Sequence, residues 1–147
     1  MRPYREYRIW QVGHQLTLDV YGATADFPTD ERSSLTRQIR RAAYSVPFNI
    51  VEGSARGDKE FHQFLRIALA SAAELDYGLL LARDLDYLSA VRHADFEHRI
   101  DNLKPMIVAF MAQLRRSLEQ AKTSSTTSRT RRPASPTVGR QGGRQDD

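Results

Sequence analysis

The chain has 147 residues, no cysteine and a net charge of +4, with 22 Lys and Arg against 18 Asp and Glu. This length suits one domain with a real core, and the lack of cysteine excludes disulfides and thiolate zinc sites. We see no signal-peptide layout and no apolar run near the roughly 20 residues that span a bilayer, so we expect a cytoplasmic protein without a membrane segment.

The first predicted helix covers residues 9–27, where apolar side chains recur at intervals of three and four residues. Gly13 lies in its interior and weakens it by about 1 kcal/mol relative to alanine, but a small residue there allows close packing. Pro28 ends the helix, because the residue before a proline is pushed out of the helical region. Asp30 or Ser33 is the expected N-cap of the next helix.

The second predicted helix extends to about Ala55 and shows three faces at 100° per residue. A core row contains Leu35, Ile39, Ala42, Val46, Ile50 and Gly53. A polar row contains Arg41, Ser45, Asn49, Glu52 and Arg56. A third, apolar row contains Tyr44, Pro47, Phe48, Val51 and Ala55. A helix with two apolar faces is usually buried on two sides, here by its own bundle and by a second chain.

Pro47 lacks an N–H, and its ring crowds the carbonyl of Ala43, which costs roughly 3 kcal/mol inside a helix. The helix either ends near Val46 and restarts, or continues with a kink. The core row keeps its phase across the proline, which favours the kink. Ser45 or Asn49 would then bond the freed carbonyls.

The third predicted helix runs from Lys59 to about Leu85, with Asp58 as its cap. Beside its core row it carries a second apolar row of Leu69, Ala73, Tyr77 and Leu80. The fourth begins after Ser89 as N-cap, shows a heptad-like row from Phe96 to Leu114, is interrupted by Pro105 and ends near Glu119.

Residues 1–120 hold 16 basic and 16 acidic side chains, so the whole positive excess lies in residues 121–147. From Lys122 onward the chain is rich in Ser, Thr, Arg, Pro and Gly, and it cannot bury enough apolar surface to fold. We therefore expect a bundle over residues 1–120 and a disordered basic tail over residues 121–147.

Four helices with short connections predict an all-α, antiparallel up-down four-helix bundle with a kinked second helix. The second apolar rows on helices two and three predict a homo-oligomer. The candidate interface residues are Tyr44, Phe48, Val51, Leu69, Tyr77 and Leu80.

A pattern along the second helix resembles the small four-helix-bundle proteins also called 23S ribosomal RNA intervening sequence proteins, or S23-like proteins. It consists of Arg40-Arg41-Ala42-Ala43, Ser45-Val46-Pro47, Asn49-Ile50 and Glu52-Gly53, with further matches from Trp10 to Leu75. The resemblance covers about residues 4–119 and implies ring-like homo-oligomers, typically pentamers. Phe48 and Val51 stand where such proteins more often carry small residues, which favours a more apolar third face.

The polar row has two interpretations: a structural one, in which Asn49 stabilises the kink and Arg and Glu pair along the helix, and a binding site for phosphate or a partner. Basic side chains give candidate nucleic-acid contacts, and we see no aromatic-basic platform that would read bases. These candidates are Arg37, Arg40, Arg41, Arg56, Lys59 and Arg66, together with Arg129, Arg131 and Arg132 in the tail. The tail is equally well explained as a solubilising extension.

The spacing of Arg56 and His62 is similar to the Arg-to-His motif of some helical ribonucleases, in which His acts as general acid or base. Gly57 replaces the usual polar residue after the Arg, and the spacing is common by chance. No metal-ligand spacing and no phosphate-cradling glycine loop occur, so we expect no metal, no cofactor and no enzyme. The expected function is an oligomeric scaffold that binds RNA, DNA or a protein. By analogy of fold, an accessory protein to a reverse transcriptase in diversity-generating retroelements is an alternative.

Overall fold

Four α-helices make up most of residues 2–129, the part of the chain that this computed structural model describes. They are α1 (Arg8–Thr24), α2 (Leu35–Ser54), α3 (Asp58–Asp84) and α4 (Ala90–Arg129), with two short 3-10 helices, η1 (Tyr4–Glu6) and η2 (Thr29–Glu31). These residues contain no strand. The predicted all-α fold is confirmed.

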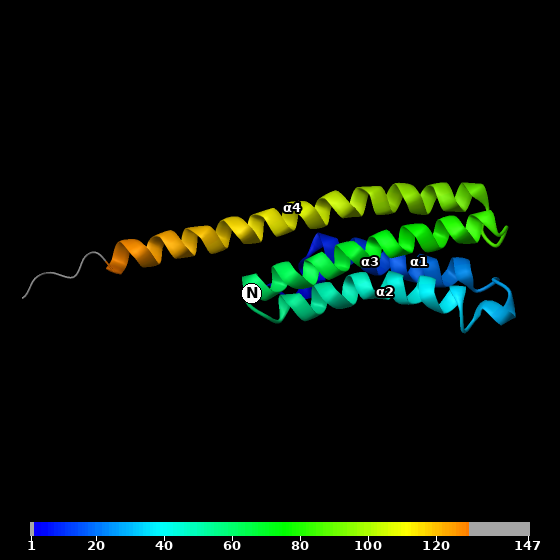
Figure 1. The fold of residues 1–147 in the computed structure, drawn as a ribbon, viewed down its shortest axis with the longest axis horizontal. Helices are drawn as coiled ribbons and strands as arrows, with labels where there is room; N and C mark the ends of the chain where they lie inside the picture. The colour runs from blue at the N-terminus through cyan, green and yellow to red at the C-terminus, as the bar shows by residue number, and fades with distance from the viewer. Residues whose placement is uncertain (1, 130–147) are drawn as a thin grey trace, which may run out of the picture.

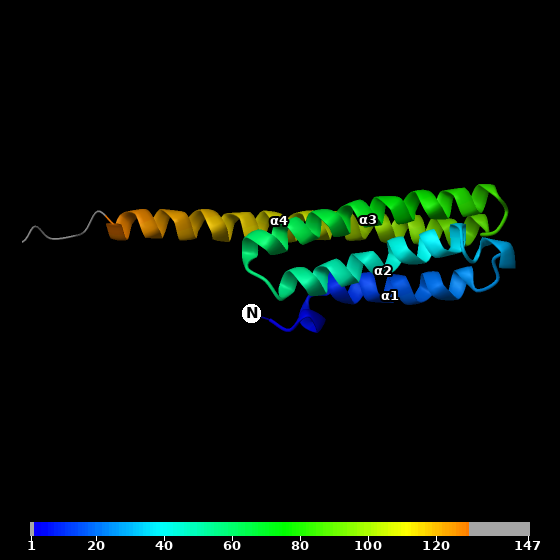
Figure 2. The ribbon, with the colours of Figure 1, turned by 60° about the horizontal axis from the view of Figure 1, so that its bottom comes forward.

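The helices alternate in direction, and each packs on the next one in the chain (Figures 1 and 2). α4 returns to α1, where Arg99 Nη2 donates to Asp19 Oδ2 over 2.6 Å. α1 and α3 lie on one diagonal of the bundle, and α2 and α4 lie on the other. The C-terminal part of α4 extends well beyond the other three helices (Figure 1).

The core is built from the apolar rows that the sequence predicts. Leu65 and Leu75 of α3 and Ile100 and Leu103 of α4 have no exposed surface. Tyr7, just before α1, adds an aromatic cluster at one end of this core, since its ring packs edge-on against Phe61 and Phe110.

α2 continues through Pro47 without interruption, as the phase of its core row predicts. Gly13 of α1 lies under the proline, and a Cβ there would stand 3.3 Å from Val46 Cγ1 and 3.7 Å from Pro47 Cδ. The Ala43 carbonyl, which cannot receive an N–H from residue 47, accepts from the Thr17 hydroxyl of α1 over 3.1 Å. Asn49 instead donates to the Ser45 carbonyl over 2.7 Å, so the predicted partner of the freed carbonyl was wrong.

Four predicted helix boundaries need correction. α1 ends at Thr24, three residues before Phe27. At the start of α2, neither Asp30 nor Ser33 is the cap: Ser34 takes that position, and Glu31 Oε2 accepts from the Leu35 N–H over 3.1 Å. Glu31 therefore supplies the partner that a capping side chain would give.

At α3, Gly57 is the N-cap and Asp58 is the first helical residue, so the predicted Asp58 cap was wrong. The predicted Ser89 cap of α4 is confirmed, because its hydroxyl accepts from the Arg92 N–H over 3.2 Å.

The predicted end of α4 near Glu119 was also wrong, because the helix continues to Arg129. No proline or glycine interrupts residues 106–132, and Ser and Thr hydroxyls bond carbonyls four residues back. Thr123 donates to the Glu119 carbonyl and Ser124 to the Gln120 carbonyl, each over 3.1 Å. The predicted disorder therefore does not hold for residues 122–129, and residues 130–147 lie outside the described part of the chain.

Candidate nucleic-acid interface

The arginine cluster near the start of α2 consists of Arg37, Arg40 and Arg41. One of the three side chains is held by contacts within the chain, and the other two have no partner in the described part of the chain. Arg40 is half-buried: its Nε donates to Thr24 Oγ1 over 2.8 Å, and its guanidinium lies 4.6 Å from the Tyr21 ring centre. The side chains of Arg37 and Arg41 are exposed and have no hydrogen bond or ion pair with any described residue. An arginine without an internal partner is free to contact a phosphate, so Arg37 and Arg41 are the better candidates.

Arg37 and Arg41 share the outward face of α2 with apolar side chains. At 100° per residue they point to the same side as Tyr44 and Phe48. Phe48 is 67% exposed and Tyr44 is 36% exposed, and their rings meet edge to face with centres 5.6 Å apart. The outward face of α2 therefore presents arginines in its first half and aromatic rings in its second half. The sequence predicts Arg41 in the polar row, apart from these two rings.

The remaining interface candidates differ in exposure. Val51 of α2 is half-buried, as are Leu69 and Leu80 of α3. Leu69 packs against the bundle's own core. Tyr77 of α3 is 64% exposed. Leu69 and Leu80 lie on the same side of α3 as His62, which contacts α4. The second apolar row of α3 is thus partly accounted for by α4, and Tyr77 is more exposed than Leu69 and Leu80.

The polar row of α2 is satisfied largely within the chain. Ser45 Oγ lies 2.7 Å from Ser71 Oγ of α3, and Asn49 Nδ2 donates to Ser45 Oγ over 3.0 Å as well as to its carbonyl. Gly53 is buried where a Cβ would approach Phe64 Cβ to 2.9 Å. These contacts favour the structural interpretation of this row, which joins α2 to α3.

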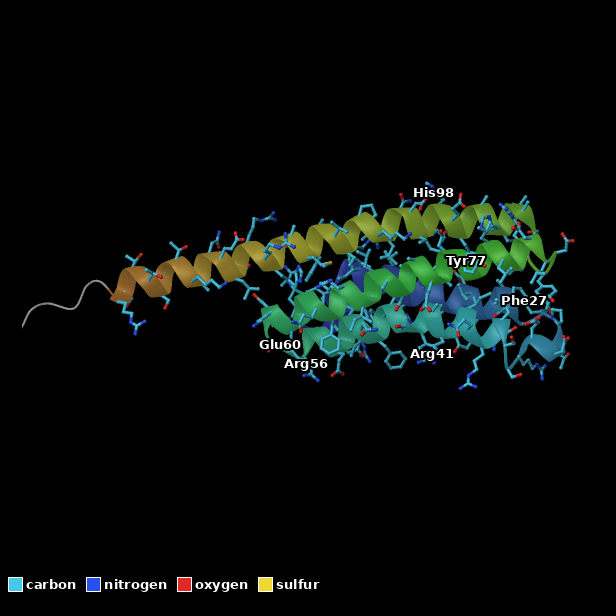
Figure 3. All side chains as sticks on the ribbon, in the orientation of Figure 1. Phe27, Arg41, Arg56, Glu60, Tyr77 and His98 are labelled. Atoms are coloured by element: carbon cyan, nitrogen blue, oxygen red, sulfur yellow. The ribbon has the colours of Figure 1, made fainter. Side chains whose placement is uncertain are left out.

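The two residues of the ribonuclease hypothesis have different partners. Arg56 donates to Glu52 Oε1 over 2.6 Å, one turn back along the chain, and its guanidinium lies 5.1 Å from the Phe64 ring centre. His62 Nε2 lies 3.4 Å from Arg115 Nη2 of α4, and this contact requires Nε2 to be the acceptor, because arginine can only donate. Arg41 and Arg56 both lie along the outer edge of the bundle (Figure 3).

The other basic candidates are spread over the surface. Lys59 and Arg66 are exposed on α3, and Arg129 is the last residue of α4. Arg131 and Arg132 lie outside the described residues. Lys59 and Arg66 have no partner among residues 2–129, so they add positive charge without forming a site with Arg37.

Within residues 2–129 no group of three or more His, Asp or Glu side chains is placed to hold a metal ion. No helix in this range combines the length and apolarity that crossing a membrane requires.

Comparison with known proteins agrees with this fold. A crystal structure of a protein of unknown function from the S23 ribosomal protein family of Bacteroides thetaiotaomicron superposes with a TM-score of 0.65, at 17% identity. The match covers 71% of this chain and 95% of that one. No curated protein matches the chain. The family model described as 23S rRNA-intervening sequence protein matches residues 5–109, which is most of the bundle. The chain thus belongs to the family of 23S rRNA-intervening sequence proteins.

Proposed function

We propose that this protein is a non-enzymatic, cytoplasmic homo-oligomeric scaffold that binds RNA. The observation that carries the proposal is the outward face of α2, where uncommitted Arg37 and Arg41 adjoin the exposed rings of Tyr44 and Phe48. The Phe48 end of this face suits a contact between copies, and the basic half suits phosphate.

Assembly of several copies would strengthen the attraction between the few arginines of each copy and RNA. Apolar side chains that are this exposed are commonly covered by a partner, and Leu18 of α1, 51% exposed, is a further apolar side chain on the surface of the bundle. The family resemblance supports a pentameric ring. In a closed ring Arg37 and Arg41 repeat in every copy, so their potentials add along one surface.

RNA binding is tested by fluorescence anisotropy with a labelled single-stranded RNA on the full chain. We expect affinity to fall steeply between about 50 and about 200 mM salt, because phosphate contacts release counterions. Exchanging both Arg37 and Arg41 for Gln is expected to weaken binding about tenfold or more and to flatten the salt dependence. Arg56→Gln is the matched control, since Arg56 already pairs with Glu52.

Unchanged RNA binding by the double variant would exclude this surface. If the wild-type chain binds no RNA and instead retains a protein through Arg37 and Arg41, the partner is a protein. We further propose that the scaffold cleaves nothing, and expect labelled RNA to stay intact during long incubation. Cleavage that His62→Ala abolishes would establish the ribonuclease instead.

A further inference from the structure

A hollow of about 490 Å³ lies between the end of α1 and the beginning of α2. Its lining includes Tyr21, Arg32, Thr36, Arg37, Arg40 and Tyr44. This volume falls within the roughly 300–1,000 Å³ that small-ligand sites commonly occupy. Since the lining residues come from two helices and the connection between them, the hollow exists only in the folded chain.

The charged residues that line the hollow are all positive. Three arginines line it, and none of the lining residues carries a carboxylate. Arg40 is fixed by Thr24 and by the Tyr21 carbonyl, 3.3 Å from its Nη2. The side chains of Arg32 and Arg37 have no hydrogen bond or ion pair within residues 2–129. Two available guanidinium groups beside an anchored third suit a phosphate, whose oxygens accept from arginine's fixed donors.

Thr36, in the wall of the hollow, provides an independent indication of a ligand. Its side chain is buried, with 4% of the residue exposed, and its Oγ1 has no hydrogen-bond partner in the described part of the chain. An unpaired buried hydroxyl costs roughly 1–3 kcal/mol, so such groups are uncommon unless something else completes them. Thr36 also lies in the first turn of α2, where the helix dipole favours a negative charge.

The aromatic residues add a surface for a flat ring. The Tyr21 ring is occupied by the Arg40 guanidinium. Tyr44 is partly exposed, and Phe48 meets it edge to face, at an angle of 79° between the rings. A base that stacks on an aromatic side chain contributes about 1–3 kcal/mol and needs no particular sequence.

We propose that this hollow binds one nucleotide unit of single-stranded RNA. Arg32 and Arg37 contact its phosphate, the Thr36 hydroxyl donates to a phosphate oxygen, and Tyr44 packs against its base. The proposal rests on the RNA-binding function proposed above, and it specifies where one nucleotide of the strand binds. A free nucleotide offers the same phosphate and base, so the test separates the two sources.

The experiment measures binding of uridine monophosphate, inorganic phosphate and a short single-stranded oligouridylate to the full chain by calorimetry. We expect the oligouridylate to bind tightest and uridine monophosphate to compete with it, with inorganic phosphate weaker than both. Arg32→Gln is expected to lower affinity for the oligouridylate about tenfold. Arg92→Gln, an exposed arginine of α4 outside the hollow, is the matched control and is expected to change it about twofold at most.

Thr36→Val supplies a second readout, because it removes the unpaired hydroxyl and nearly preserves shape. Without ligand this variant is expected to unfold at the same or a higher temperature than wild type. With oligouridylate it is expected to show a smaller rise in melting temperature than wild type.

If both Arg32→Gln and Thr36→Val bind RNA with wild-type affinity, the hollow is not the binding site. The proposal that RNA binds to the outward face of α2 would then still hold. Tight binding of the mononucleotide without RNA binding would make the free nucleotide the occupant and overturn this proposal. Binding of neither would overturn both this proposal and the RNA-binding function.

Discussion

The hydroxyl of Thr17 on α1 donates to the carbonyl of Ala43 on α2 over 3.1 Å, at the carbonyl that Pro47 leaves without its helical donor. The same hydroxyl donates to the Gly13 carbonyl over 2.8 Å, so its one hydrogen is shared between the two carbonyls. One turn of α1 thus supplies both the space for the proline ring and the missing hydrogen-bond donor. This contact explains how a proline is accommodated inside a buried helix.

Thr17→Val is expected to lower the free energy of unfolding by about 1–3 kcal/mol, because it leaves the buried Ala43 carbonyl unpaired. In a Pro47→Ala background residue 47 regains an N–H that can bond this carbonyl, so the same substitution should cost less. Urea unfolding of the four proteins measures this difference as a double-mutant cycle. Equal costs in both backgrounds would show that the Thr17 hydroxyl does not serve the Ala43 carbonyl.

Two helical glycines should respond in opposite directions to alanine. A Cβ at Gly53 would stand 2.9 Å from Phe64 Cβ and 3.0 Å from Phe61 Cδ1, whereas a Cβ at Gly22 meets nothing within 4 Å. Gly53→Ala is expected to destabilise the protein by about 1–3 kcal/mol, because α2 and α3 must separate. Gly22→Ala is expected to stabilise it by about 0.5–1 kcal/mol through helix propensity. Thermal unfolding compares the two, and similar shifts for both would contradict the close approach at Gly53.

Tyr87 and Glu31 predict a stability change at high pH. Partial burial, then the charge of Glu31 and the hydrogen bond to its Oε1 over 3.3 Å, raise the pKa of Tyr87 above its ordinary value of 10.0. The folded state therefore holds the phenol proton more tightly than the unfolded state. Its contribution is complete below about pH 10 and is lost as the pH rises through the folded-state pKa.

Urea unfolding of wild type and Tyr87→Phe between about pH 8 and about pH 11 tests this linkage. The wild-type protein should lose more stability over this range than the variant, which has no phenol to ionise. Parallel curves for the two proteins would show that the environment of Tyr87 does not favour its neutral form.

The sequence predicts the helices and the core well, because apolar periodicity reports directly on which face is buried. Ile39 and Ile100 are examples, placed on core rows by spacing and buried in the structure. The predicted end of α4 near Glu119 was wrong because the residues that follow are rich in Ser and Thr, which are typical of disordered segments. The absence of proline and glycine between Glu119 and residue 133 was the better indicator. In the helix these hydroxyls, such as that of Thr123, bond the preceding turn.

The candidate site was predicted only in part, because it joins residues that are distant in the chain. The sequence predicts Arg37, Arg40 and Arg41 as nucleic-acid contacts, but it does not show that Tyr21 and Thr24 of another helix hold Arg40 and leave the side chains of Arg37 and Arg41 unpaired. For the same reason the sequence showed no aromatic-basic platform. The unpaired hydroxyl of Thr36 has no sequence signal, since most threonines in helices find a partner.

Phe48→Glu should dissociate the proposed assembly. A carboxylate at the centre of an apolar contact between copies would lose its hydration, while on a solvent-facing position of a monomer it costs little. We expect a single-chain species with unchanged helix content by circular dichroism. Val108→Glu, at a residue of α4 that is 51% exposed, is the control that should leave the assembly intact.

The most direct measurement is the mass of the full-length wild-type chain in solution, by size-exclusion chromatography with light scattering. We expect one species whose mass is a multiple of the 16.8 kDa chain, and we expect Phe48→Glu to reduce this mass to that of a single chain. A wild-type protein that elutes as a monodisperse species of 16.8 kDa would contradict the homo-oligomeric scaffold.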